Sequence, residues 1–167
     1  MLNVKTLHLI RHGKSSWEQP GVADIDRSLL PKGIANSALV AEKLVTRFGK
    51  PDIIISSPAN RTIHTALIMA RTMQFDTGQI NIIPSVYESS VSNIIEIVES
   101  MPSHFNSIAI VGHNPTFTDL ANLFLCERIE NIPTSGIVTL QFNIKDWNII
   151  DKAPTAHYLE FPKKDYF

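Results

Sequence analysis

Short runs of apolar, mostly β-branched residues alternate along this chain with longer segments in which apolar residues recur every three or four positions. Residues 53–55 and 107–111 are runs of the first kind, and the stripe from 34 to 48 is of the second kind. A continuous apolar run suits a parallel strand that is covered on both faces, and a period near 3.6 indicates an amphipathic helix. The alternation predicts an α/β fold, a three-layer α/β/α sandwich with a mostly parallel central sheet.

The same patterns set the expected order of elements. Residues 137–142 and 147–150, separated by 143–146, are interpreted as an antiparallel hairpin at the sheet edge, and 157–161 carries a weaker strand pattern. Ser57 and Pro58 are expected to open a helix as its N-cap and first residue. With 167 residues, no repeat and no linker-like stretch, the chain is expected to be a single domain, 1–167. The other strands are expected at 4–10, 52–56, 81–83 and 107–111, and the helices at 34–48, 59–73, 91–101 and 116–126.

Composition narrows the possible partners. Fifteen Lys and Arg residues against 16 Asp and Glu residues give a net charge of −1, which argues against nucleic-acid or anionic-membrane binding as the main role. The single cysteine, Cys126, excludes an internal disulfide and a thiolate cluster, and its position after an apolar run predicts a buried, inert side chain. No signal peptide or membrane-spanning run is evident, so a cytoplasmic protein is expected.

Unusual polar residues follow three of the predicted strands. Because ligands of such sheets bind beyond the carboxyl ends of the strands, these residues are expected to meet in one site. Arg61 would fall in the first turn of a helix, where free backbone N–H groups and the helix dipole favour an anion. Two arginines and two histidines at one sheet edge indicate a phosphate pocket with a possible nucleophile. The three segments are R-H-G at 11–13, S-S-P at 56–58 followed by Arg61, and G-H-N-P at 112–115.

Some residues in and near these segments have other interpretations than a phosphate pocket. His8 and His12 are four residues apart, but on a strand this spacing separates them by about 13 Å, too far to share a metal ion. Asp24, Asp26 and Arg27 form a charged loop that is either a solvated surface or the rim of the pocket, since it follows His12 by about a dozen residues.

These segments resemble a known family. R-H-G at 11–13 resembles the signature of the histidine phosphatase (phosphoglycerate-mutase-like) superfamily, and S-P-A-N-R at 57–61 with Thr65 and Ala66 is similar to a second block of it. V-G-H-N-P at 111–115 is similar to the second-histidine block of the small SixA-type phosphohistidine phosphatase branch. The segment from 11 to 33 also resembles that branch, and the resemblance extends over roughly residues 4–150.

The resemblance implies a role for each site residue. His12 would attack phosphorus as a neutral imidazole and become a phosphohistidine. Arg11, Arg61 and a cationic His113 would bind the three phosphoryl oxygens, and Gly13 would let the backbone approach closely beside the nucleophile.

A general acid is also implied, and Glu88 is the candidate. A solvent-exposed glutamate at a helix entrance is the alternative interpretation of that residue. Neither a metal nor another cofactor is expected, because the two arginines and His113 would supply the positive charge. The expected rim of the pocket consists of Ser15, Asp24, Asp26, Arg27 and Asn114.

The expected activity is that of a metal-independent phosphatase acting on protein phosphohistidine and releasing inorganic phosphate. Only 52 positions separate Arg61 from His113, and the predicted strands and helices fill them, so no lid is expected over the site. An open site suits a phosphorylated side chain on another protein. The alternatives are a phosphatase of small phosphate esters, a mutase, and a phosphate-binding module without turnover. Neither nucleic acid nor a membrane is an expected partner.

Overall fold

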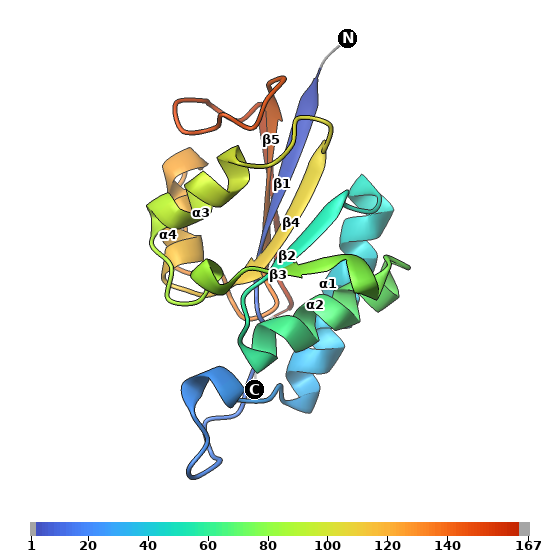
Figure 1. Cartoon of the computed structure of the whole chain (residues 1–167), viewed down its shortest axis with the longest axis vertical. Helices are drawn as coiled ribbons and strands as arrows, with labels where there is room; N and C mark the ends of the chain where they lie inside the picture. The colour runs from blue at the N-terminus through green and yellow to red at the C-terminus, as the bar shows by residue number, and fades with distance from the viewer. Residues whose placement is uncertain (1–2, 164–167) are drawn as a thin grey trace.

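The computed structural model describes residues 3–163 and contains a six-stranded mixed sheet between two layers of helices (Figure 1). The strand order is β3-β2-β4-β1-β5-β6. The first four strands of this order run parallel, β5 is antiparallel to β1, and β6 is antiparallel to β5. The predicted α/β/α sandwich, mostly parallel with an antiparallel edge, is therefore confirmed. The strands are β1 (Val4–Arg11), β2 (Ile53–Ser56), β3 (Ile80–Ile82), β4 (Ser107–Gly112), β5 (Ile137–Asn143) and β6 (Ala156–Glu160).

Two helices cover each face of the sheet. The helices α1 (Pro31–Phe48) and α2 (Asn60–Thr72) pack on one face, and α3 (Val91–Glu99) and α4 (Thr116–Phe124) pack on the other (Figure 1). Within residues 3–163, no helix combines the length and apolarity needed to cross a membrane. Because α4 ends at Phe124, Cys126 lies beyond the helix and is exposed, so the prediction that it is buried is wrong.

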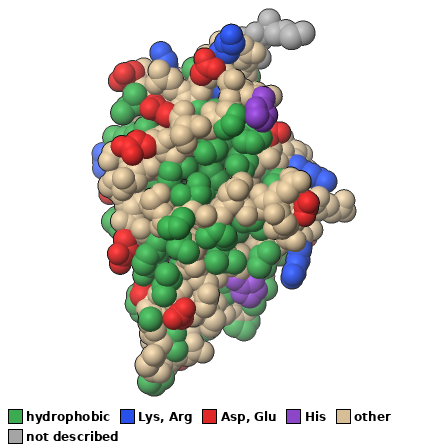
Figure 2. Space-filling view, viewed as in Figure 1, with side chains coloured by type: hydrophobic (Ala, Val, Ile, Leu, Met, Phe, Trp, Pro, Cys, Tyr) green, Lys and Arg blue, Asp and Glu red, His purple; other side chains and the backbone are tan. Residues whose placement is uncertain are grey.

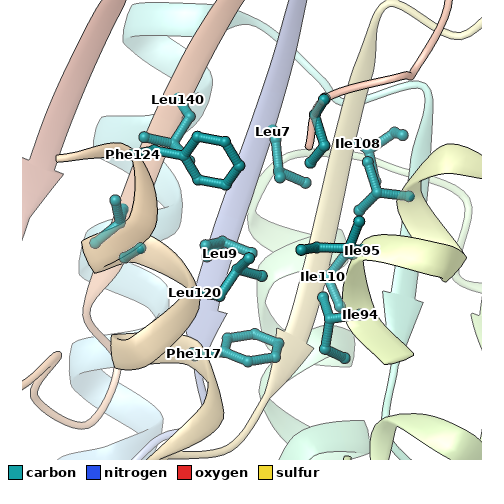
Figure 3. Close-up of a cluster of buried hydrophobic side chains, with 14 of the residues drawn as sticks. Leu7, Leu9, Ile94, Ile95, Ile108, Ile110, Phe117, Leu120, Phe124 and Leu140 are labelled. Atoms are coloured by element: carbon teal, nitrogen blue, oxygen red, sulfur yellow. The ribbon is translucent and has the colours of Figure 1, made fainter. Parts of the chain in front are cut away.

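The larger apolar core lies between the sheet and the α3–α4 layer (Figure 3). Leu9 of β1 and Ile110 of β4 meet Phe117 and Leu120 of α4 there, and all four side chains have no exposed surface. Full burial of one such side chain stabilises a fold by about 1.5–3 kcal/mol. This packing fixes β1 and β4 side by side, and both strands lead directly into the candidate site.

The segment 147–150, predicted as the second strand of the hairpin, is not a strand. Trp147 and Ile149 are buried, and the Trp147 ring N–H donates to the carbonyl of Phe105. The backbone N–H groups of Ile149 and Ile150 donate to the Glu99 carboxylate at the end of α3 instead of to a neighbouring strand. The apolar residues that suggested a strand therefore belong to a loop that closes the core. On the side of β5 away from β1, the pairing strand is β6, in the region of the weaker pattern.

The start of α2 also differs from the prediction. Ala59 is its N-cap, without a side-chain cap, and Pro58 precedes the helix. The Ser57 hydroxyl accepts a long hydrogen bond from the Ala59 N–H (3.3 Å) and contacts the His113 ring at 2.7 Å. Ser57 therefore supports a histidine of the candidate site instead of capping the helix.

The first turn of α1 packs directly against the residues that follow β1. A Cβ atom on Gly13 would lie 2.8 Å from the carbonyl oxygen of Gly33, and one on Gly33 would collide with the backbone of Lys14. The carbonyl of Lys14 accepts a hydrogen bond from the N–H of Leu30, the N-cap of α1. Both glycines are therefore required by this close approach of backbone to backbone.

Gly33→Ala is expected to destabilise the fold by about 1–3 kcal/mol, because the added methyl group forces α1 away from residues 13–14. In a helix without this contact, alanine would stabilise by about 1 kcal/mol. The free energy of unfolding in urea measures the effect. Gly78→Ala is the matched control, because its Cβ would meet only the Asp76 carboxylate oxygen at 3.3 Å in an exposed turn. Equal stability of Gly33→Ala and wild type would contradict the close-packing argument.

Candidate active site

Three strand ends bring the predicted residues together at the carboxyl edge of the sheet (Figure 1). Arg11 of β1 pairs with Gly112 of β4, and Ser56 of β2 pairs with Val111, so the residues after these strands start side by side. A cavity of about 830 Å³ opens there. Its lining includes Arg11, His12, Arg61 and His113, the four residues placed at the phosphate by their sequence positions.

The ring of His12 is almost fully buried and has a defined orientation. Its Nδ1 lies 2.7 Å from the carbonyl oxygen of Gly13, and since a carbonyl only accepts, Nδ1 carries the proton. The Arg61 Nε–H group points at Nε2 from 3.3 Å, so Nε2 bears the lone pair. Burial lowers the pKa of His12 to about 3; the hydrogen bond to Gly13 opposes this shift, and the nearby His113, Arg61 and Arg11 add to it. His12 is therefore a neutral imidazole with its lone pair at an arginine.

Thr65 links the nucleophile segment to α2. Its hydroxyl donates to the carbonyl of Arg61 and accepts from the backbone N–H of Gly13 at 2.9 Å. The threonine that follows the S-P-A-N-R segment thus ties the backbone beside His12 to the helix turn that carries Arg61.

His113 contacts Arg61 on one side and Ser57 on the other. Arg61 donates to its Nδ1 at 3.3 Å, which leaves Nε2–H to donate to the Ser57 hydroxyl at 2.7 Å. Burial, followed by the charge of Arg61, lowers the pKa of His113 to about 4. The expected cation is therefore neutral in this structure, because it lies half-buried next to an arginine. A phosphoryl group beside it would favour the protonated form.

Arg11 is held by a loop that the sequence did not single out. Its Nη1 donates to the carbonyl of Ile132 at 2.8 Å and, more weakly, to the side-chain oxygen of Asn131. The side-chain amide of Asn114 donates to the same two oxygens. Within residues 3–163 the buried Nε of Arg11 has no hydrogen-bond partner, which leaves a donor for an anionic ligand.

Asp24, on the rim of the cavity, accepts hydrogen bonds from three neighbouring side chains. Its carboxylate accepts hydrogen bonds from Arg61 at 3.0 Å, from Arg27 at 3.0 Å and from the Tyr87 hydroxyl at 2.7 Å. Partial desolvation would raise the pKa of Asp24, but these hydrogen bonds outweigh it and lower the pKa to about 2. The hydrogen bond that the Tyr87 hydroxyl donates to Asp24 raises the pKa of Tyr87. Asp24 stays ionised and orients Arg61, so it is a poor source of protons.

Of the other predicted rim residues, three line the cavity and one does not. Arg27 is buried and donates to the Ser15 hydroxyl at 2.9 Å, and both line the cavity, as does Asn114. Asp26 is exposed and does not line it, because successive residues of the 3-10 turn Asp24–Asp26 point in different directions.

Glu88 lies at the cavity wall and is exposed. Its backbone has a φ of 53°, in the left-handed region that non-glycine residues rarely adopt. Such a conformation is frequent at active sites and ligand-binding sites.

Several lining residues had no recognisable signal in the sequence. Tyr87 adjoins the candidate acid Glu88 but has no motif of its own, and the loop before β5 carries no family block. Asn131, Pro133 and Thr134 come from that loop. Among residues 3–163, no group of three His, Cys, Asp or Glu side chains is arranged to hold a metal ion.

Comparison with known proteins places this chain in a family. The model of the histidine phosphatase superfamily (branch 1) matches residues 7–94, which include His12 and Arg61. An uncharacterized protein of Mycobacterium tuberculosis is 30% identical over 145 residues, covering 79% of this chain and 86% of the relative.

Two solved structures are similar over most of their length. One, from Agrobacterium tumefaciens, has been assigned as a phosphohistidine phosphatase SixA; it is 29% identical, with a TM-score of 0.74 over 81% of this chain and 90% of that one. A second with the same assignment, from Nakamurella multipartitia, has the same fold at 19% identity, with a TM-score of 0.82 over 95% and 96%.

The chain belongs to the histidine phosphatase superfamily, in its SixA-type branch. As a member of this family it is a phosphatase, a hydrolase that acts on phosphorylated substrates.

The lowered pKa of His12 predicts a specific loss of stability in acid. Between pH 6.5 and about 3, the unfolded chain binds a proton at His12 that the folded chain does not, so the free energy of unfolding falls as the pH falls. One such proton corresponds to about 1.4 kcal/mol per pH unit. His12→Asn should reduce the slope of unfolding free energy against pH, measured from pH 4.5 to 6, by about this amount.

The surface variant His104→Gln is the control and should keep the wild-type slope. If His12→Asn also keeps it, His12 is protonated in the folded protein and the assignment of its neutral form fails.

Proposed function

We propose that this phosphatase removes phosphoryl groups from phosphohistidine in proteins, through a covalent phosphohistidine at His12. The observation that carries the proposal is the orientation of the His12 ring, with Nδ1–H on the Gly13 carbonyl and the Nε2 lone pair facing Arg61. A neutral imidazole held in this way is ready to attack phosphorus without first losing a proton.

In the first step a bond forms between Nε2 of His12 and phosphorus while the bond to the leaving group breaks. The 3.3 Å contact between Arg61 Nε and His12 Nε2 is long, so a phosphoryl oxygen entering between them can take over the Arg61 hydrogen bond. Arg11 has an unpaired Nε–H donor, and His113 can add a third positive charge once an anion is bound. These groups match the negative charge that spreads over the phosphoryl oxygens during transfer.

In the second step a water oxygen bonds to phosphorus and the Nε2–P bond breaks, which frees inorganic phosphate and neutral His12. Glu88 is the proposed acid for the leaving group and base for this water. Asp24 is unsuited because its pKa lies near 2. A phosphohistidine substrate needs less help, since its ring can take a proton from water at the other nitrogen before the P–N bond breaks.

The shape of the site supports a side chain of another protein as the substrate. The chain between Arg61 and His113 is used by α2, β3, α3 and β4, so these elements leave no inserted domain over the cavity. The cavity of about 830 Å³ is also within the range of small-ligand pockets, which makes a small phosphate ester the second candidate.

Phosphate release from a panel of substrates tests the proposal. We expect phosphohistidine proteins to be hydrolysed with a higher kcat/KM than phosphoserine, sugar phosphates or p-nitrophenyl phosphate. The assay contains EDTA, because no proposed step uses a metal. His12→Ala should abolish turnover. Faster hydrolysis of a sugar phosphate would select the small-ester alternative, and formation of a phosphate isomer instead of free phosphate would identify a mutase.

Arg61→Ala and Glu88→Gln should fail in different ways. Arg61 contacts the oxygens of every substrate, so its loss should lower kcat/KM by about 30- to 1000-fold, or about 2–4 kcal/mol, on all of them. Glu88→Gln should cost about 100-fold on an alkyl phosphate and far less on an aryl phosphate with a good leaving group. Rates of both variants on both esters decide the roles, and an equal loss on the two esters for Glu88→Gln would exclude it as the acid.

A further inference from the structure

Trp17 is an unusually exposed aromatic residue at the edge of the catalytic cavity. Its side chain is 79% exposed, more than any other large hydrophobic residue in 3–163, and it lines the same cavity as His12. Tryptophan has a large apolar surface that is unfavourable in water and is enriched where proteins bind partners. None of the catalytic steps above uses this ring.

The ring is nevertheless held in place. The Arg27 guanidinium lies 3.5 Å from its centroid, so one ring face is covered by a cation. Arg27 is itself buried and fixed by hydrogen bonds to Asp24 and Ser15. A ligand that packs on Trp17 therefore meets a positioned surface and loses less conformational entropy than it would with a free side chain.

Trp17 and Arg27 stand between two hollows. Beside the catalytic cavity lies a smaller one of about 140 Å³, and both are lined by Trp17, Asp24 and Arg27. The smaller hollow is also lined by Ser16, Gln19 and Val22. Its volume is far below the roughly 300–1,000 Å³ of pockets that enclose a whole small molecule, so it suits a single side chain.

The position of the ring relative to His12 restricts which part of a substrate can reach it. Arg27 contacts Trp17, Asp24 contacts Arg27, and Arg61 joins Asp24 to His12. With the phosphoryl group at His12, these three intervening side chains separate it from a substrate group on Trp17, which suits a residue next to the phosphorylated one.

The surrounding segment extends this surface. The chain between β1 and α1 projects beyond the carboxyl edge of the sheet, at the lower left of Figure 1, and hydrophobic side chains are exposed at the lower end of the molecule in Figure 2. Pro20 is exposed, and Val22 is 38% exposed. A polypeptide lying across this end could contact the segment while its phosphorylated residue enters the cavity.

We propose that Trp17 and the smaller hollow bind an apolar side chain that flanks the phosphorylated residue of a polypeptide substrate. The inference rests on the proposed function, since it assigns a specificity-determining residue to the same site. It predicts that substrate sequence affects the rate through an apolar neighbour of the phosphorylated residue.

Two pentapeptides with a central phosphohistidine, flanked on both sides by leucine or by glycine, test the proposal. For the wild type we expect kcat/KM to be about tenfold higher with the leucine flanks, mainly through a lower KM. Trp17→Ala should bring the ratio of the two kcat/KM values close to one, and Trp17→Phe should retain part of the preference. Leu123→Ala removes another exposed apolar side chain (63% exposed), outside the cavity, and should keep the wild-type ratio.

If Trp17 only holds Arg27 in place, Trp17→Ala lowers kcat/KM for both peptides by the same factor and leaves their ratio unchanged. That result would overturn the proposal. So would the absence of a leucine preference in the wild type. If the enzyme hydrolyses p-nitrophenyl phosphate but no phosphohistidine peptide, the substrate class proposed above is wrong. The same two peptides with a central phosphoserine then test the role of Trp17. If the wild type hydrolyses neither peptide, or hydrolyses both with the same kcat/KM, the proposed role of Trp17 is overturned.

Discussion

The hydrogen bond between His12 Nδ1 and the Gly13 carbonyl determines how this site can work. It fixes the tautomer and the ring orientation, and so places the lone pair of Nε2 at Arg61. The carbonyl is itself positioned by close packing, because Gly13 lies against Gly33 at the start of α1 and its N–H donates to Thr65 of α2. The two helices on one face of the sheet thus hold the nucleophile in register.

Charge in the site is balanced around one carboxylate. Asp24 accepts hydrogen bonds from Arg27, Arg61 and Tyr87, while burial and the neighbouring cations keep the pKa values of His12 and His113 low. Without Asp24 the two arginines would face each other uncompensated. The arrangement orients Arg61 before a substrate binds, so less reorganisation is needed when the phosphoryl group arrives. Orienting Arg61 and donating a proton to the leaving group are therefore tasks of different residues, because Asp24 is too acidic to donate a proton.

The sequence predicted the parts of this structure that depend on local pattern. Parallel strands end at one edge, so the sequence alone predicts that the residues after β1, β2 and β4 lie together. Longer-range contacts had no such signal. The apolar residues of 147–150 suggest a strand, but the backbone N–H groups of Ile149 and Ile150 donate to the Glu99 carboxylate instead. Likewise, the support of Arg11 by Asn131 depends on how a loop without a motif folds back on the site.

The most direct test of the account is the site of phosphorylation in the trapped intermediate. p-Nitrophenyl phosphate serves as phosphoryl donor to enzyme carrying ¹⁵N-labelled histidine, and coupling between ³¹P and ¹⁵N after rapid quenching in base identifies the nitrogen. The account predicts a single phosphorylated histidine, His12, bonded through Nε2. A phosphoryl group on Nδ1 of His12, on His113, or on an oxygen would contradict it.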